Sequence, residues 1–108
     1  MLFTTFTVKD NEYKLRLNAR NIVNLEKQIG CNPISIFGTG DTIPSITTMV
    51  HILHNSLQQY QANITLEKTY SIFDEWLDDG HTITDFIQVI VDIYKVSGLI
   101  AENATEKN

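Results

Sequence analysis

The stretch that decides the fold is residues 82–100, which read TITDFIQVIVDIYKVSGLI. Its few polar side chains, Asp85, Gln88, Asp92 and Lys95, recur three or four residues apart, which is the spacing of one face of an α-helix. The many β-branched residues would also suit a buried strand, but the length of the stretch and this spacing favour a helix. We predict a helix that begins at Thr82 and takes Asp85 as its capping partner.

Outside that narrow polar line the predicted helix is apolar on more than one face. Such a helix is either wrapped by the rest of the chain or in contact with another molecule. Phe86, Ile90 and Tyr94 lie four residues apart on one seam, which we assign to the core. A neighbouring seam continues to the end of the stretch, and we predict that it meets a partner or a second copy. The residues of this candidate interface are Val89, Ile93, Val96, Leu99 and Ile100.

Residues 1–17 alternate between polar and apolar side chains, as half-buried strands do. Two such runs surround the polar residues 9–12 and predict a β-hairpin. An isolated hairpin is marginal in water, so its apolar face needs cover from the rest of the chain.

Residues 18–100 carry the spacing of helices. We expect a helix at 18–29 with Asn18 as its cap and Gly30 as its stop, a second that starts near Pro44, and a third at 65–79 with Thr65 as its cap and Gly80 as its stop. One short helical turn is expected at 32–38. The side chains that these segments are expected to turn inward are Ile22, Leu25, Ile29, Ile34, Phe37, Ile46, Met49, Val50, Leu53, Leu57, Tyr60, Leu66, Tyr70, Ile72, Phe73, Trp76 and Leu77.

The predicted fold class is therefore α+β and mainly α, with an N-terminal β-hairpin packed on a bundle of about four helices. We expect a single domain over residues 1–108, with the hairpin at 1–17, the helical part at 18–100 and a flexible tail at 101–108. With 108 residues, of which 43% are hydrophobic, the chain can bury one core. No apolar run approaches the roughly 20 residues that cross a bilayer, so we expect no membrane partner.

The net charge of −5 is unevenly distributed. Residues 1–30 hold five basic and three acidic residues, whereas residues 31–108 hold three basic and ten acidic residues. The chain lacks the dense basic patch of a nucleic-acid-binding protein, so we expect no nucleic-acid partner. The asymmetry would let one end of a copy attract the other end of the next, and we expect a homo-oligomer. Two ordinary solvated surfaces would give the same counts.

The residue types that carry chemistry form no recognisable motif. His51 and His54 could face one metal ion, but no third ligand accompanies them, because His81 lies in a distant turn. The acidic residues 74–80 fail the spacing of a calcium loop. Cys31 has no activating base nearby in sequence. We therefore predict no catalytic residue, no cofactor and no metal site.

Several segments, taken in order, resemble a known family. They are IVNLEKQIGCNP (22–33), FG (37–38), PSIT (44–47), ILHNSLQ (52–58), IFDEWLDDG (72–80) and VSGLI (96–100). Together they resemble the tail assembly chaperones of long-tailed, siphovirus-type phages and prophages of Gram-positive bacteria. The resemblance covers about residues 1–100 and rests on helix caps, stops and core positions.

The resemblance implies a helical, non-enzymatic protein of the host cell cytoplasm that binds the tape measure protein, helps the tail tube assemble and is absent from the mature virion. It also implies a longer, frameshifted product that recruits tail tube protein. The codons of residues 106–108 can be written with a slippery run, so we predict a −1 shift near Lys107. The alternatives are a small helical adaptor or regulatory phage protein and, without any motif in its favour, a small enzyme subunit.

Overall fold

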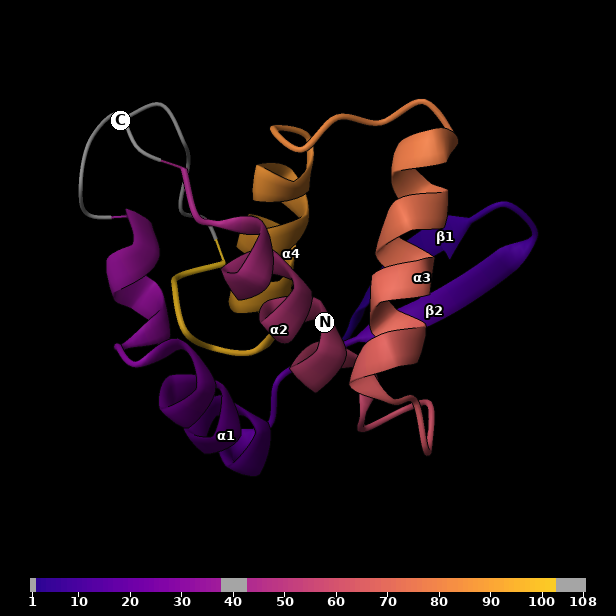
Figure 1. The fold of residues 1–108 in the computed structure, drawn as a ribbon. Coiled ribbons are helices and arrows are strands. Elements are labelled where there is room, and N and C mark those ends of the chain that lie inside the picture. Colours follow the sequence, from indigo (N-terminus) through magenta and orange to yellow (C-terminus); the bar gives the residue numbers. More distant parts are fainter. Residues whose placement is uncertain (1, 38–42, 103–108) are drawn as a thin grey trace.

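The structure, a computed structural model, describes residues 2–37 and 43–102 (Figure 1). The hairpin consists of β1 (Thr4–Val8) and β2 (Asn11–Leu15). The helices are α1 (Ala19–Ile29), α2 (Ile46–Leu57), α3 (Leu66–Asp78) and α4 (Phe86–Val96), with a 3₁₀ turn, η1 (Pro33–Phe37), between α1 and α2. The predicted α+β, mainly helical fold class is confirmed. Residues 38–42 and 103–108 lie outside the described residues, and with them most of the predicted flexible tail and the predicted frameshift position.

The hairpin forms where the alternation of side chains predicts it. β1 and β2 pair antiparallel across a turn at residues 9–10, and Lys9 in this turn has a left-handed φ of 55°. Tight hairpin turns need this conformation because it matches the twist of the strands. Phe6, Val8 and Leu15 share one face of the sheet and are buried, so the hairpin covers one side of the core.

Both ends of α1 follow the signals in the sequence. The Asn18 side chain accepts a hydrogen bond from the Asn21 N–H (2.9 Å), and the Asn21 side chain in turn accepts from the Asn18 N–H. Gly30 ends the helix with a left-handed φ of 76°, which glycine adopts without a steric penalty. Leu25 is buried at the centre of the inward face.

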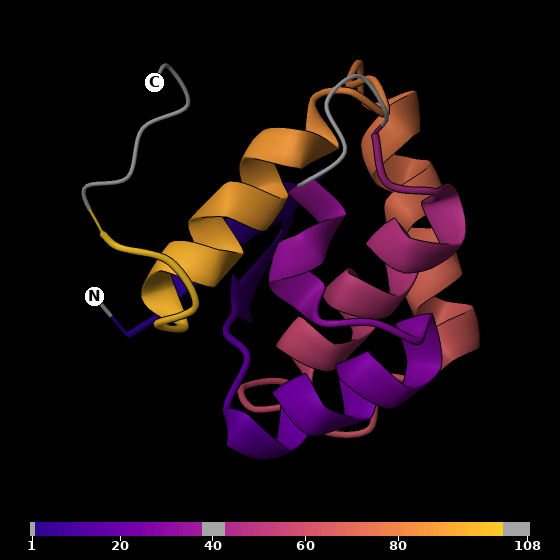
Figure 2. The same cartoon turned by 90° about the vertical axis from the view of Figure 1, so that its left-hand side faces the viewer.

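The helix α2 runs through the middle of the molecule, with α1 on one side and α3 on the other (Figures 1 and 2). Its cap is Ser45, whose side chain accepts from the Thr48 N–H at 3.1 Å. The helix was predicted to start near Pro44, and it begins at Ile46, because Ser45 is the N-cap residue and its backbone is extended (ψ 161°). The residues that α2 buries are Met49, Val50, Ile52, Leu53, Asn55, Ser56 and Leu57.

The turn η1 differs from the prediction in which side chains it buries. A 3₁₀ helix places residues three apart on the same face. Pro33 is buried and Ile36 half-buried, so Ile34 and Phe37 lie on the outer face and are exposed. The prediction that Ile34 and Phe37 fill the core is wrong for this reason. The hydroxyl of Tyr94 donates to the Pro33 carbonyl (2.9 Å) and thereby ties η1 to α4.

The helix α3 begins at its predicted cap, Thr65, which accepts from the Lys68 N–H at 3.0 Å. Its inward face is rotated relative to the prediction. Leu66, Tyr70 and Leu77 are only half-buried at the margins. The residues that α3 buries are Thr69, Ile72, Phe73 and Trp76.

The helix α4 is shorter at both ends than predicted. Thr82 and Asp85 make the expected reciprocal hydrogen bonds, at 2.8 and 3.3 Å, but they do so in a turn that precedes the regular helix. At the other end Gly98 has a φ of 81°, and the Leu99 N–H returns to the Tyr94 carbonyl (3.0 Å). Leu99 and Ile100 therefore lie beyond the helix and fold back against the core.

The predicted core seam of α4, Phe86, Ile90 and Tyr94, is confirmed, because all three are fully buried. Two members of the predicted α2 stripe are instead exposed. Ile46 lies at the first helical position and Tyr60 beyond the last, where little of the chain covers them.

We expect Phe86→Ala to lower the free energy of unfolding by about 3–5 kcal/mol, because it removes a buried ring and leaves a cavity. Denaturant unfolding followed by circular dichroism measures this loss. Val23→Ala, at an exposed position of α1, is the control and should change stability by about 0.5 kcal/mol or less. Similar stability of the two variants would contradict the assignment of Phe86 to the core.

Candidate interaction surface

The five residues of the predicted interface do not form one exposed seam. Ile93 has 0% of its surface exposed and belongs to the core, so its assignment to an interface is wrong. The inward face of α4 is wider than one seam of residues four apart. It includes Ile93 because positions seven apart also share a helix face, as Phe86 and Ile93 do. Val89, Val96, Leu99 and Ile100, the other predicted residues, are half-buried.

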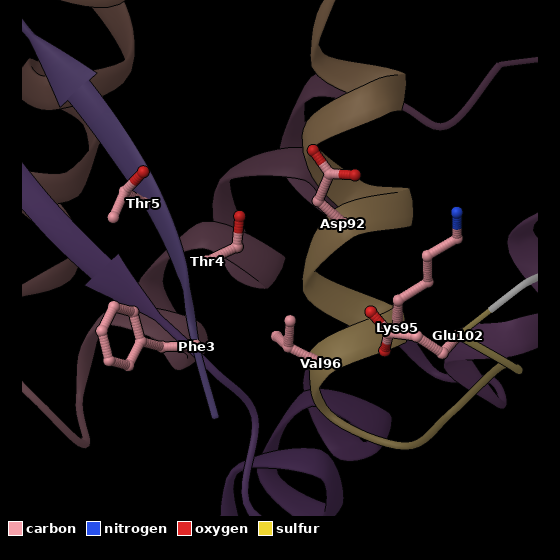
Figure 3. Close-up of a pocket in the computed structure, with 7 residues that line it drawn as sticks. All are labelled: Phe3, Thr4, Thr5, Asp92, Lys95, Val96 and Glu102. Carbon is pink, nitrogen blue, oxygen red and sulfur yellow. The ribbon is translucent and has the colours of Figure 1, made fainter. Parts of the chain in front are cut away.

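Val96 lines a groove of about 340 Å³ between β1 and α4 (Figure 3). Asp92 and Lys95 line the α4 side, and Thr4 lines the strand side. Glu102 contributes at the end of the described chain. The groove therefore carries charges of both signs beside two apolar side chains, Phe3 and Val96.

The strand wall of this groove is an open sheet edge. The Lys14 N–H donates to the Gln61 side-chain oxygen (2.7 Å), and the Gln61 amide donates to the Lys14 carbonyl (2.9 Å). Both backbone groups of Lys14 thus point away from β1. Thr5 is opposite Lys14, so its N–H and C=O must point away from β2 in the same way. Thr7, opposite Glu12, repeats this arrangement two residues on, and no hydrogen bond from the described residues reaches this side of β1.

An arginine fixes one end of the groove. The Arg16 guanidinium donates to the carbonyl of Leu2 and to the carbonyl of Val96, both at 3.1 Å. Next to it, the Leu17 N–H donates to the Ser97 hydroxyl (2.8 Å). These bonds join the segments on either side of the hairpin, before β1 and after β2, to the C-terminal end of α4. This end of the groove is therefore held by hydrogen bonds between residues 80 positions apart in sequence.

Exposed apolar side chains lie elsewhere, on either side of residues 38–42. We call them the apolar patch: Ile34 (41% exposed), Phe37 (39%), Ile43 (52%) and Ile46 (44%). The end of η1 and the chain entering α2 approach the same end of the molecule in both views (Figures 1 and 2). The ring of Phe37 also touches Tyr94 edge-on at 5.6 Å, which limits its movement. Large apolar residues exposed near one another are typical of a protein-binding surface.

Helical periodicity missed the apolar patch because it assigned three of its residues to the core. The signal that could have found it is Pro33 at the start of η1. Proline suits the first turn of a helix, and a five-residue segment after it is more often a 3₁₀ turn than a full helix. A spacing of three places Pro33 and Ile36 on one face and Ile34 and Phe37 on another, so the first pair becomes a second candidate for the inward face.

The two histidines considered as metal ligands each make a hydrogen bond to another element. His51 Nδ1 lies 3.1 Å from the Gln28 side-chain oxygen, and His54 Nε2 lies 3.1 Å from the Ile64 carbonyl. Nε2 of His54 must carry a proton to make this bond. Nδ1 of His54 is buried and has no hydrogen-bond partner among residues 2–37 and 43–102. In the part of the chain that the structure describes, no three His, Cys, Asp or Glu side chains gather as a metal site would require.

Burial lowers the pKa of His54, and His51 lowers it further, while the bond to the Ile64 carbonyl acts in the opposite direction. We expect the free energy of unfolding to fall as the pH drops below about 6.5, the ordinary pKa of histidine. Below that pH the unfolded chain binds a proton that the folded His54 binds only at lower pH. Urea unfolding between about pH 7.5 and 5 measures the effect. His54→Gln should show a shallower fall, and equal slopes for both proteins would contradict this origin.

Residues 3–108 match the model of a protein family described as "Family of unknown function (DUF6096)". No curated protein and no solved structure matches the chain. None of the helices described here is both long enough and apolar enough to cross a bilayer.

Proposed function

The chain belongs to the DUF6096 family, and we propose that it is a tail assembly chaperone of a long-tailed phage or prophage. In this role it binds the tape measure protein in the host cytoplasm while the tail tube assembles, and it does not remain in the mature virion. The proposal starts from the resemblance of residues 22–33, 52–58, 72–80 and 96–100 to such chaperones.

The observation that carries the proposal is the apolar patch. A chaperone of a long, helical, apolar-rich client needs apolar surface that its own fold does not use. Helix-binding surfaces recognise apolar side chains that recur along one face of the bound helix. Ile34, Phe37, Ile43 and Ile46 offer such contacts, because the fold leaves 39–52% of the surface of each exposed.

A second form of the protein would connect the client to the tail tube. In the proposal, a −1 shift near Lys107 extends a minor fraction of the chains by a segment that binds tail tube protein. The last described residues, Ala101 and Glu102, are exposed, so an extension from this end would start at the surface. The frameshifted form requires a slippery run in the codons of residues 106–108 and an overlapping reading frame.

Co-expression with the tape measure protein encoded nearby, followed by pull-down, tests the proposal. We expect the wild-type chain to retain the tape measure protein. The double variant Ile34→Asp/Ile43→Asp should lose about tenfold or more of the captured protein, because each charge would have to be desolvated against an apolar client. The variant changes only exposed side chains, so its thermal unfolding should match that of the wild type.

The matched control is Leu2→Asp/Thr5→Asp, which adds the same charge at two exposed positions of the hairpin. The control should capture as much tape measure protein as the wild type does. Failure of the wild type to retain the tape measure protein, or equal capture by the patch variant and the control, would refute the proposal.

The open edge of β1 favours a second candidate, an adaptor that takes an extended segment of a regulatory protein as an added strand. Thr5→Pro distinguishes this candidate, since it deletes an N–H that points away from β2 and leaves the bonds of the hairpin in place. Loss of a captured regulatory protein in Thr5→Pro, with no change in capture of the tape measure protein, would favour the adaptor.

A further inference from the structure

The solvent face of α1 combines two cations with an apolar residue. Leu25 points inward, and the opposite side of the helix carries Arg20, Asn24 and Lys27, with Val23 at its margin. All four side chains are exposed, and they line a shallow hollow of about 370 Å³. This face of α1 is therefore basic at both ends, with an open space between its two charges.

The solvent face of α3 carries the opposite charges in the same pattern. Glu67, Ser71, Asp74 and Asp78 lie on the side opposite the buried Trp76, and all four are exposed. Glu67 and Asp74 have the small Ser71 between them. The single cation of α3, Lys68, lies about a quarter turn away from this face.

The two faces match in length as well as in sign. Arg20 and Lys27 are seven residues apart, and so are Glu67 and Asp74, a rise of about 10.5 Å in each helix. Two cations can therefore meet two carboxylates at the same time when the helices lie side by side. The space beside Ser71 then lies opposite the middle of the α1 face, where Val23 needs cover.

The positions of the two helices decide which molecule can supply the partner face. α2 lies between α1 and α3 (Figures 1 and 2), and each of the two outer helices packs against it. The exposed side of each outer helix is the one opposite its buried residues. Within one chain the two faces therefore cannot meet. A second copy can bring its α3 onto α1, and its own α1 is then free to bind a third copy. Such a contact is heterologous, so it repeats until it closes into a ring or grows as a filament.

We propose that the solvent face of α1 docks on the solvent face of α3 of a second copy, with Arg20 and Lys27 paired with Glu67 and Asp74. The use of such an assembly rests on the proposed function: a row of copies would present repeated apolar patches to a long client. A contact of two short helices buries less than a standard interface of about 1,600 Å², so the association is weak and sensitive to salt.

Charge reversal separates this contact from any other mode of association. The first variant, Arg20→Glu/Lys27→Glu, makes both helix faces acidic, and the second, Glu67→Lys/Asp74→Lys, makes both basic. Each variant alone should be a monomer. An equimolar mixture should associate again, because the acidic α1 of the first variant meets the basic α3 of the second, and the unchanged faces of the two variants also match.

Sedimentation velocity at about 20 and 500 mM NaCl gives the readout, over protein concentrations from tens to hundreds of micromolar. We expect the wild-type mass to rise with concentration at low salt and to fall to that of a monomer at high salt. Asp10→Lys/Glu12→Lys is the matched control for the second variant. It makes the same change in net charge at exposed positions of the hairpin and should associate as the wild type does.

A wild type that stays monomeric at low salt overturns the proposal, as do single variants that associate like the wild type or a mixture that stays monomeric. Thermal unfolding of each variant shows that it is folded, and the chain with all four reversals should associate on its own again. None of these measurements contains the tape measure protein. A failure to self-associate therefore does not change the pull-down result, and a failed pull-down does not change the sedimentation result.

Discussion

The contact on which the rest of the fold depends is the burial of the Phe86 ring among three other aromatic rings. Phe73 and Trp76 approach it edge-on from α3 at 5.2 and 5.5 Å, and Phe6 approaches from β1 at 6.1 Å. Edge-to-face pairs at these distances add to the free energy of burial itself. Because β1 is far from α3 and α4 in sequence, this cluster joins the hairpin to α3 and to the start of α4.

The consequences of that cluster extend along α4. Once Phe86 is fixed, the helix carries Ile90, Ile93 and Tyr94 into the same core, and the Tyr94 hydroxyl reaches the Pro33 carbonyl. Burial raises the pKa of Tyr94, so the hydroxyl keeps the proton that it donates in this bond. The turn η1 is thereby held with its outer residues exposed. The position of η1, and with it of Ile34 and Phe37 in the apolar patch, thus depends on α4, although no residue of α4 belongs to the patch.

The sequence predicted best where a single local interaction determines the structure. The caps at Asn18 and Thr65 and the stop at Gly30 depend on a side chain or a φ angle within three residues, and all are confirmed. The alternation of Phe6, Val8 and Leu15 likewise determines which face of the hairpin is buried.

The candidate site was predicted less well, because exposure depends on elements that are distant in sequence. Ile93 has the same local pattern as Val89, yet it is buried, and only the packing of α4 separates them. Ile34 and Phe37 share one face of η1, as predicted, but Pro33 and Ile36 form the face that packs on the core. The groove beside Val96 depends on Arg16, which reaches carbonyls at both ends of the chain. No local pattern in the sequence marks such a bond.

The Gln61 side chain blocks the outer edge of β2, so the two edges of the hairpin differ. Its amide group binds the backbone of Lys14 as a neighbouring strand would, so it terminates the sheet on the β2 side. Residues 2–8 carry neither a charge nor a proline, which are the usual guards against edge-to-edge aggregation. A sheet blocked on one side cannot stack in both directions, and growth into a cross-β fibril requires both. One glutamine side chain therefore confines strand addition to the β1 edge, and a sheet that can pair on one side alone has no open-ended route to amyloid.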